Sequence, residues 1–344
     1  MKNLKFKKLM AIALAFALIF TCAAPVFANE LSTVNGIENM HENKTLDFSF
    51  LLDENFISEE RRREAQLELE SLDMESRLQA LRENRDGKYT VISEFEVYRE
   101  LRALEEDSLY RADLSENQLY FVQNFTQQFV EQVELFQTLE DETLKCLGYT
   151  EEQIYIIRNF QGTYEQIEAL SARATVNLSA DFARYSRSAG RTSSRLSFTF
   201  VWSGVPVFGM TDLMAVGWDG WVLASSHGNL MYRNINVRDR IIWRAPTFVA
   251  SDQGSGFGAG FRYPAKINDN AYFAAEGWAT FVVDSAGRRD MHATGTLSHS
   301  RITFSLNPTF SVGVTGVSPS ITVSAGVNPL RFNDSASARV TDHP

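Results

Sequence analysis

Cysteine is almost absent from this chain. Of the two cysteines in 344 residues, Cys22 lies near the N-terminus and Cys146 stands alone in the remainder. A single thiol cannot build an internal disulfide framework, so apolar packing must hold the fold together. A basic excess is missing as well, because 33 Lys+Arg face 43 Asp+Glu and the net charge is −10. The sequence therefore lacks the basic footprint of a nucleic-acid-binding protein.

Long apolar runs are scarce too, and the one near the N-terminus predicts a secretory signal peptide. Four lysines precede the unbroken apolar run Leu9–Phe20, and the small residues Val26 and Ala28 suit cleavage after Ala28. The run would form a helix of only about 18 Å, too short for a hydrocarbon core of ~30 Å. We therefore expect residues 1–28 to be removed and the chain to be secreted and extracellular.

Charge, glycine and tryptophan divide the remainder into two unlike halves. Residues 29–190 carry 33 acidic against 16 basic side chains, whereas residues 191–344 carry 10 against 13. All five tryptophans and 16 of the 20 glycines lie at or after Gly190. We predict a two-domain α+β protein. A linker or mobile arm (29–55) precedes an acidic helical domain (56–171) and a Gly/Trp-rich antiparallel β domain (172–344).

Helical periodicity fills the acidic half. The charged stretch 58–84 carries a ragged leucine stripe, and we interpret its charges as a solvated helix face. One clear helix bears five apolar residues on one face, Val122, Phe125, Phe129, Val133 and Phe136. Four capping boxes mark predicted helix starts, at Ser93-x-x-Glu96, Ser115-x-x-Gln118, Thr150-x-x-Gln153 and Thr163-x-x-Gln166. Cys146 lies in this half between two leucines, and we expect it to be a buried apolar residue.

From Ala174 the apolar period falls from 3.6 to 2, which indicates half-buried strands. The runs 174–183 and 196–202 should pair as a hairpin with a long loop. Further strand candidates are 213–217, 221–224, 241–244, 272–275, 279–283, 292–297, 302–306, 310–314 and 321–323. About ten short strands with frequent breaks predict an antiparallel sandwich or a barrel-like domain.

The segment from Thr294 to Val327 is nearly uncharged, with Arg301 its only ionised side chain. Its alternation fits a sandwich strand with one face in water. It also fits a hairpin that inserts into a membrane, since its runs between Pro-containing breaks approach the ~9–11 residues that spanning strands need, although Gly313, Gly316 and Gly326 interrupt them. We favour the sandwich and keep membrane insertion as the alternative.

Signals for a cofactor or a metal are weak. The run Gly254-Ser255-Gly256-Phe257-Gly258-Ala259 fits the pattern G-x-G-x-x-A, but Pro264 argues against the helix that a dinucleotide site requires. The glycines more simply form a flexible loop, or a strand that another backbone approaches closely. The histidines show no metal-ligand spacing. We expect no cofactor and no metal.

Signals for catalysis are equally weak. Ser226-His227, in a predicted turn, lacks the G-x-S-x-G elbow of a hydrolase. Glu276 is the sole glutamate of the β half and, with Asp284 or Asp290, would imitate the two carboxylates of a glycosidase. A solvated loop acid is the simpler interpretation. The enzyme question stays open, and a non-enzymatic role is favoured.

The feature that stands out is Trp218-Asp219-Gly220-Trp221, in which two tryptophans flank a turn signal. Exposed there, they would form an aromatic platform for a sugar, a protein or a membrane interface; pointing inward, they would be core. We predict Trp218, Asp219 and Trp221 as binding residues, with at least one indole reachable by solvent.

Three functions follow from these observations. The first is a secreted non-enzymatic binding protein, acting at the cell surface or in the medium, whose partner would be a surface glycan, a wall polymer or a protein. The second is a membrane-active protein of the pore-forming or bacteriocin-like kind. The third is a cell-wall or polysaccharide hydrolase, supported only by scattered carboxylates. No nucleic-acid partner is expected.

Overall fold

The computed structural model describes residues 56–83, 89–106, 116–207, 211–218, 220–251, 257–300, 309–315, 318–324 and 330–343. The predicted signal peptide and the predicted arm at 29–55 lie outside the described residues. The described residues belong to one compact unit. Among the described residues, no helix is both long and apolar enough to cross a bilayer.

Helices dominate up to residue 170, as predicted. They are α2 (Glu59–Glu70), α3 (Met74–Glu83), α4 (Glu94–Glu106), α5 (Glu116–Gln137), α6 (Asp141–Cys146), α7 (Glu151–Arg158) and α8 (Tyr164–Leu170). Two of the predicted capping boxes are confirmed at Thr150 and Thr163. Each threonine hydroxyl accepts a hydrogen bond from the backbone N–H of the glutamine three residues on, and each threonine backbone N–H donates to that glutamine's side chain. The five apolar residues predicted on one face of α5 are all buried.

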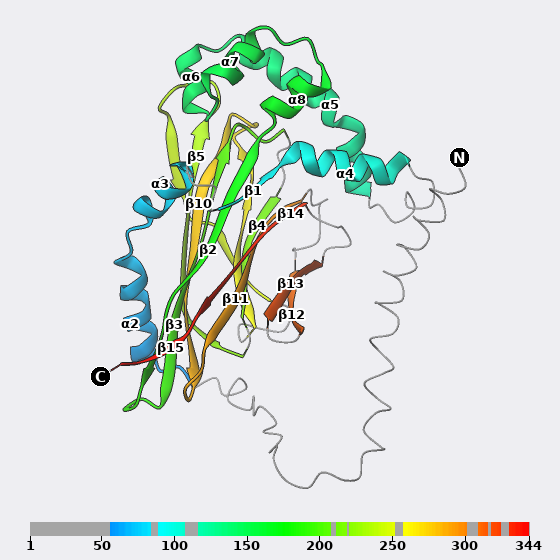
Figure 1. The fold of residues 1–344 in the computed structure, drawn as a ribbon. Helices are drawn as coiled ribbons and strands as arrows, with labels where there is room; N and C mark the ends of the chain where they lie inside the picture. Colours follow the sequence, from blue (N-terminus) through cyan, green and yellow to red (C-terminus); the bar gives the residue numbers. More distant parts are fainter. Residues whose placement is uncertain are drawn as a thin grey trace, which may run out of the picture. The chain divides into compact units, whose positions relative to one another are not determined.

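The remaining chain forms two antiparallel sheets that face each other, so the sandwich alternative is the one observed (Figure 1). The first sheet comprises β1 (Thr90–Ser93), β2 (Arg173–Ser186), β3 (Arg191–Ser203), β10 (Tyr272–Ala286), β5 (Val222–Asn234) and β6 (Ile241–Arg244), in that order, with β9 (Lys266–Ile267) beside β10 and β15 (Val340–His343) parallel to β2. The second comprises β14 (Leu330–Ala338), β11 (Met291–Ser300), β4 (Thr211–Trp218), β8 (Gly258–Pro264) and β7 (Thr247–Ala250). A separate hairpin joins β12 (Thr309–Thr315) to β13 (Ser318–Ser324).

Several elements differ from the sequence-based prediction. The β2–β3 hairpin has a short connection, since β3 begins at Arg191. The two candidates 272–275 and 279–283 are parts of the single long strand β10. β1 lies within the predicted helical half and pairs with the start of β2. The candidate at 302–306 lies outside the described residues.

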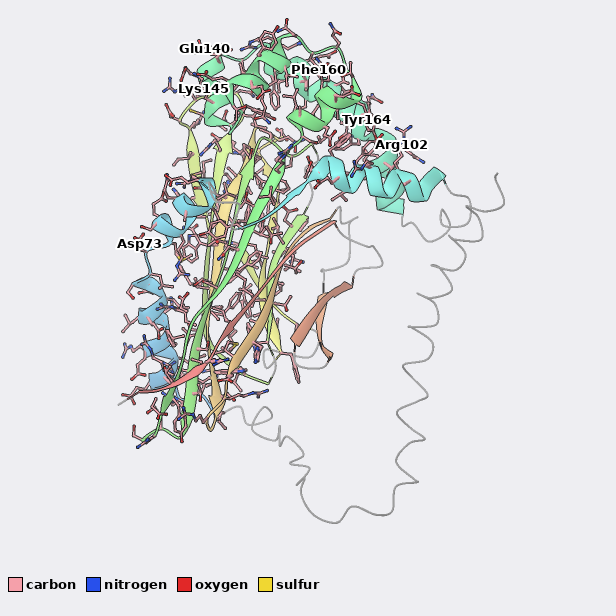
Figure 2. All side chains as sticks on the ribbon, in the orientation of Figure 1. Asp73, Arg102, Glu140, Lys145, Phe160 and Tyr164 are labelled. Atoms are coloured by element: carbon pink, nitrogen blue, oxygen red, sulfur yellow. The ribbon has the colours of Figure 1, made fainter. Side chains whose placement is uncertain are left out.

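One apolar cluster fills the space between the sheets and continues into the helices. It joins residues of β3, β4, β8 and β10 to residues of α4 through α8. The sheets approach closely at Gly295 of β11, where an added Cβ would lie 2.5 Å from the ring of Phe198 on β3. Helices α4–α8 lie at one end of the sandwich, and Figure 2 labels Phe160 and Tyr164 there. Their rings lie beside those of Phe129 and Phe95, at centroid distances of 6.3 and 4.9 Å.

Helices α2 and α3 lie instead along the outer face of the first sheet (Figure 1). Small apolar clusters hold them there: Ala65 and Leu69 of α2 pack with Val282 of β10, and Met74 and Leu78 of α3 pack with Trp278. The charged stretch 58–84 was predicted to be a solvated helix face. Arg62 and Arg63 are exposed as predicted, but the prediction is wrong for Arg61. Arg61 is buried, because its guanidinium binds a carboxylate of the sheet.

Candidate binding surface

The two tryptophans singled out in the sequence lie inside the sandwich. Trp218 ends β4 with 0% of its surface exposed, and Trp221 is 1% exposed. The indole Nε1 of Trp218 donates a hydrogen bond of 2.9 Å to the carbonyl of Trp221, and its ring lies 5.6 Å from that of Phe281. The expectation of a solvent-reachable indole is therefore wrong at both positions, because both side chains are buried in the core. Asp219 lies outside the described residues, and a binding role for the three stays a prediction.

The carboxylates that would imitate a glycosidase are held by arginines. Arg82 of α3 donates to both oxygens of Glu276, at 2.8 and 2.5 Å. Arg61 of α2 donates to both oxygens of Asp284, at 2.8 and 3.0 Å. Eight positions on one strand separate these acids by about 26 Å at ~3.3 Å per residue, whereas glycosidase pairs lie within about 10 Å. Both acids are buried, so they are not the solvated loop acids that the sequence indicated; their geometry suits attachment of α2 and α3.

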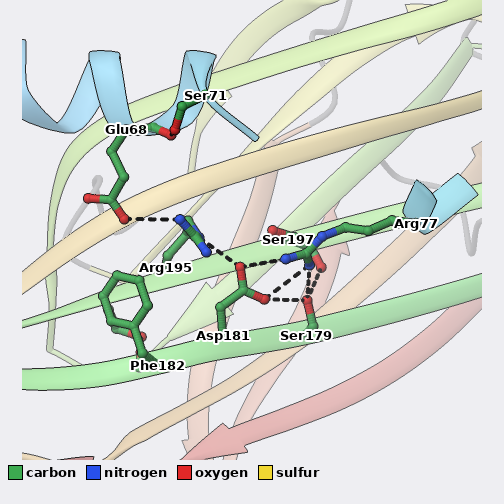
Figure 3. Close-up of polar contacts among 9 residues, drawn as sticks. Glu68, Ser71, Arg77, Ser179, Asp181, Phe182, Arg195 and Ser197 are labelled. Carbon is green, nitrogen blue, oxygen red and sulfur yellow. Dashed lines mark hydrogen bonds and ion pairs between the residues drawn. The ribbon is translucent and has the colours of Figure 1, made fainter. Parts of the chain in front are cut away.

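A third acid completes this attachment. The carboxylate of Asp181 on β2 accepts hydrogen bonds from both terminal nitrogens of Arg77, at 3.0 and 2.7 Å. It also accepts one from Arg195 Nε at 2.7 Å (Figure 3). Arg195 also reaches Glu68 of α2 at 3.3 Å. Burial acts to raise the pKa of Asp181, but the hydrogen bonds from Arg77 and Arg195 outweigh it and hold this pKa below its ordinary value.

The other weak chemical signals do not form a site. Ser226 and His227 are consecutive residues of β5 rather than of a turn, so their side chains point to opposite faces of the sheet. The His227 ring lies 4.9 Å from that of Trp278. Gly258 and Gly260 belong to β8, where a Cβ on Gly260 would lie 2.5 Å from the Met214 carbonyl oxygen, as expected of a strand that another backbone approaches closely.

Neither a metal cluster nor a fully buried thiol is present in the part of the chain that the structure describes. There, no group of three or more His, Cys, Asp or Glu side chains could hold a metal ion. Cys146 was expected to be buried and is only half-buried, because it ends α6 and faces the loop after β5, with Sγ 3.7 Å from an Asp239 oxygen.

Exposed apolar side chains gather elsewhere, on the segment that leaves β5 and forms β6 and β7. We call the following residues the edge surface: Val237, Arg238, Arg240, Ile241, Trp243, Arg244 and Phe248. Trp243 is the only exposed tryptophan of the five, at 43%, and Ile241 is 46% exposed. Val237 and Phe248 are similarly exposed, at 47% and 43%. The sequence predicted a strand at 241–244, but its alternation gave no sign that the face bearing Ile241 and Trp243 stays uncovered.

The sheet order explains why this face is uncovered. β6 and β7 are the last strands of the two sheets, and only residues 245 and 246 separate them. At the other end of the first sheet, β1 pairs with the first part of β2 and β15 with its last part. Helices α2 and α3 contact β2, β3, β10 and β5. The sandwich therefore closes one side with its own strands and presents β6 at the other.

The edge surface is basic in an acidic protein. Three exposed arginines lie on it against a single acid, Asp239, whose carboxylate is 3.1 Å from Arg238. The Arg238–Asp239 pair is the ion pair of this segment, and within the described residues the exposed Arg240 and Arg244 form neither a side-chain hydrogen bond nor an ion pair. Two unpaired positive charges beside exposed aromatic and aliphatic groups are typical of an interaction surface.

Comparison with known proteins identifies no family. No protein-family model matches the chain, and no curated protein matches it. Among solved structures, it is similar to the collagen-binding subdomain of the Enterococcus faecalis surface protein ACE (TM-score 0.24, 4% identity, covering 48% of this chain and 95% of that chain). It is also similar to the collagen-binding domain of a Staphylococcus aureus adhesin (TM-score 0.23, 7% identity, 45% and 93% covered) and to a pore forming protein (TM-score 0.23, 6% identity, 47% and 90% covered). Likenesses this distant carry no argument about function.

Proposed function

We propose that this chain is a secreted, non-enzymatic binding protein that contacts its partner through the edge surface. The observation that carries the proposal is the exposure of Trp243 and Ile241 beside unpaired arginines, in a molecule that buries its other tryptophans. Buried aromatic and arginine anchors supply most of the binding energy in protein interfaces. The predicted signal peptide supports an extracellular site of action.

The arginine-bound carboxylates favour this function over a hydrolase. Glu276 and Asp284 are each neutralised by a bidentate guanidinium and lie too far apart to act together. The membrane-active alternative relies on the uncharged hairpin of β12 and β13, whose strands have seven residues each, fewer than the ~9–11 that span a bilayer. Leakage of dye from anionic and neutral vesicles tests it directly, and leakage at low protein concentration would support it.

The proposed function is tested by comparing two double variants. Ile241→Ser/Trp243→Ser alters the edge surface, and Leu135→Ser/Tyr155→Ser alters exposed apolar residues on α5 and α7 as a matched control. Sedimentation with whole cells of the producing organism and with isolated wall material measures binding. The edge variant should bind at least about thirtyfold more weakly, in line with ~2 kcal/mol for an anchor, with an unchanged melting temperature. Wild-type binding by the edge variant, or an equal loss in the control, would overturn the proposal.

A further inference from the structure

We propose that β6 is a docking edge for an extended, acidic segment of a partner protein, which adds to the first sheet as one more strand. This inference rests on the proposed function and names the chemistry of the partner. Three properties of β6 carry it: the direction of its main-chain groups, the placement of its exposed side chains and its charge.

The main-chain groups of Ile241 and Trp243 point away from the sheet. β6 pairs antiparallel with β5, with Ile242 opposite Tyr232 and Arg244 opposite Leu230. The backbone N–H of Asn234 donates to the Arg240 carbonyl at 2.9 Å, so residues 234 and 240 form a hydrogen-bonded pair. Such pairs recur at every second residue of an antiparallel ladder. Ile242 and Arg244 therefore bond to β5, and the N–H and C=O groups of Ile241 and Trp243 face the open edge.

The exposed side chains belong to these same two residues. Ile241 and Trp243 lie two positions apart, so their side chains share one face of the sheet. On that face Trp243 lies opposite Met231, and Ile241 lies opposite Arg233. An added strand would place its alternate residues beside Ile241 and Trp243, where aromatic and β-branched neighbours stabilise strand pairing. One continuous strip of β6 thus offers both hydrogen bonds and apolar contact.

The charge of the strip selects an acidic segment. Arg240 immediately precedes β6, Arg244 ends it, and Arg238 lies in the loop that leads into it. Glutamate or aspartate side chains of an added strand would meet unpaired guanidinium groups, whereas lysines would be repelled. An anionic membrane would also attract these arginines, but it cannot offer donors and acceptors in register with Ile241 and Trp243. The free edge therefore favours a polypeptide over a lipid surface.

Synthetic peptides test the inference. The probe is a ten-residue peptide that alternates glutamate with valine, and its matched counterpart carries lysine in place of glutamate. We expect the glutamate peptide to bind with a change in tryptophan fluorescence and the lysine peptide not to bind. Hydrogen exchange should slow at the amides of Ile241 and Trp243, while the amides of Ile242 and Arg244, already bonded to β5, keep their rates. Equal binding of the two peptides, or slowed exchange away from β6, would overturn the inference.

Removing a single main-chain donor distinguishes strand addition from nonspecific binding through apolar contact and charge. Ile241→Pro removes an N–H that faces the open edge, where proline is tolerated, and Ile241→Ala keeps it. The proline variant should bind the glutamate peptide about fivefold more weakly than the alanine variant, the effect of one hydrogen bond. If circular dichroism shows that the proline variant has lost structure, glutamate peptides N-methylated at alternate residues replace it. N-methylation removes N–H donors from the peptide and leaves the protein unaltered. Equal binding of methylated and unmethylated peptides would contradict strand addition.

The outcomes also separate this inference from the proposed function. If the peptides do not bind but the edge double variant still loses its binding to cells or wall material, the edge surface is functional and strand addition is wrong. Vesicles of anionic lipid test the alternative that the arginines bind a membrane surface. Binding to these vesicles without peptide binding would likewise overturn the inference.

Discussion

Individual tryptophans of this protein have opposite surroundings. Trp218 and Trp221 lie in the core and are joined by a hydrogen bond, whereas Trp243 lies half exposed on a strand edge. The same side chain therefore contributes to stability at two positions and is available for contact at the third. Substitution by alanine separates these contributions.

Trp218→Ala and Trp221→Ala should each lower the free energy of unfolding by about 3–5 kcal/mol, because each leaves a cavity in a packed core. Trp243→Ala should change it by about 0.5 kcal/mol or less, as for other surface substitutions. Urea denaturation of the purified variants measures the difference. If either core variant proves as stable as Trp243→Ala, the packing described for the sandwich is incorrect at that position.

Asp181 should make the free energy of unfolding fall as the pH is lowered. Its pKa is lowered in the folded protein, so its contribution is present above its ordinary pKa of 3.8 and is lost as the pH falls through the folded value. We expect Asp181→Asn to weaken the protein at pH 7 and to flatten the fall in its urea midpoint between about pH 5 and pH 2. An unaltered slope in the Asp181 variant would contradict this role.

At the scale of elements, α2 and α3 are attached to the sheet by charge as much as by apolar contact. Arg61, Arg77 and Arg82 each meet a buried or half-buried carboxylate of the sheet, and the apolar clusters beneath the two helices are small. Such pairs favour one register of a helix over others, because a shift would leave a buried charge without its partner.

Removing one partner of the buried Arg61–Asp284 pair should lower the free energy of unfolding more than replacing both partners by apolar residues. Arg61→Met leaves the Asp284 carboxylate buried with only Arg191 at 3.7 Å, and should destabilise the protein by about 3–5 kcal/mol. The double variant Arg61→Met/Asp284→Leu should lose less, since it buries no unpaired charge. Lys145→Met, at an exposed pair with Glu142, should lower the stability far less, because solvent screens that pair. Urea denaturation decides, and a double variant weaker than Arg61→Met would contradict the explanation.

At the scale of the whole molecule, the helices and the sheets share one apolar cluster. Residues of α4–α8 and of both sheets belong to it, and the Val205 backbone N–H donates to the Tyr149 hydroxyl at 3.3 Å where the helices meet β3. The sequence predicted a domain boundary near residue 172. Whether each part folds alone is a question of stability that a fragment answers.

The fragment 172–344 is expected to fold on its own, with β structure by circular dichroism and a cooperative thermal transition. Its melting temperature should lie well below that of the full chain, because the apolar end covered by α4–α8 becomes exposed to water. If exposure of this apolar end lowers the melting temperature, adding residues 56–171 as a separate chain should raise the melting temperature again. A fragment that remains unfolded would show that the predicted boundary divides a single folding unit.

Local patterns were sufficient to predict much of the architecture. Capping boxes at Thr150 and Thr163, the buried stripe of α5 and the change of period at Ala174 depend on neighbours in sequence, and the structure confirms them. These features were readable because helix capping and side-chain alternation are set within a few residues.

The candidate site was decided by tertiary structure alone. Trp218 was predicted to flank a turn and Trp243 to lie on a strand, and no local pattern tells that β4 has neighbours on both sides while β6 ends its sheet. Likewise, three arginines of α2 and α3 resemble a solvated face until the fold brings Asp181, Glu276 and Asp284 beneath them from distant strands. Neighbouring residues alone set which side chains alternate and where helices begin. Burial, pairing and exposure depend on which elements pack together, and strand order at the sheet edge decided that β6 remains free.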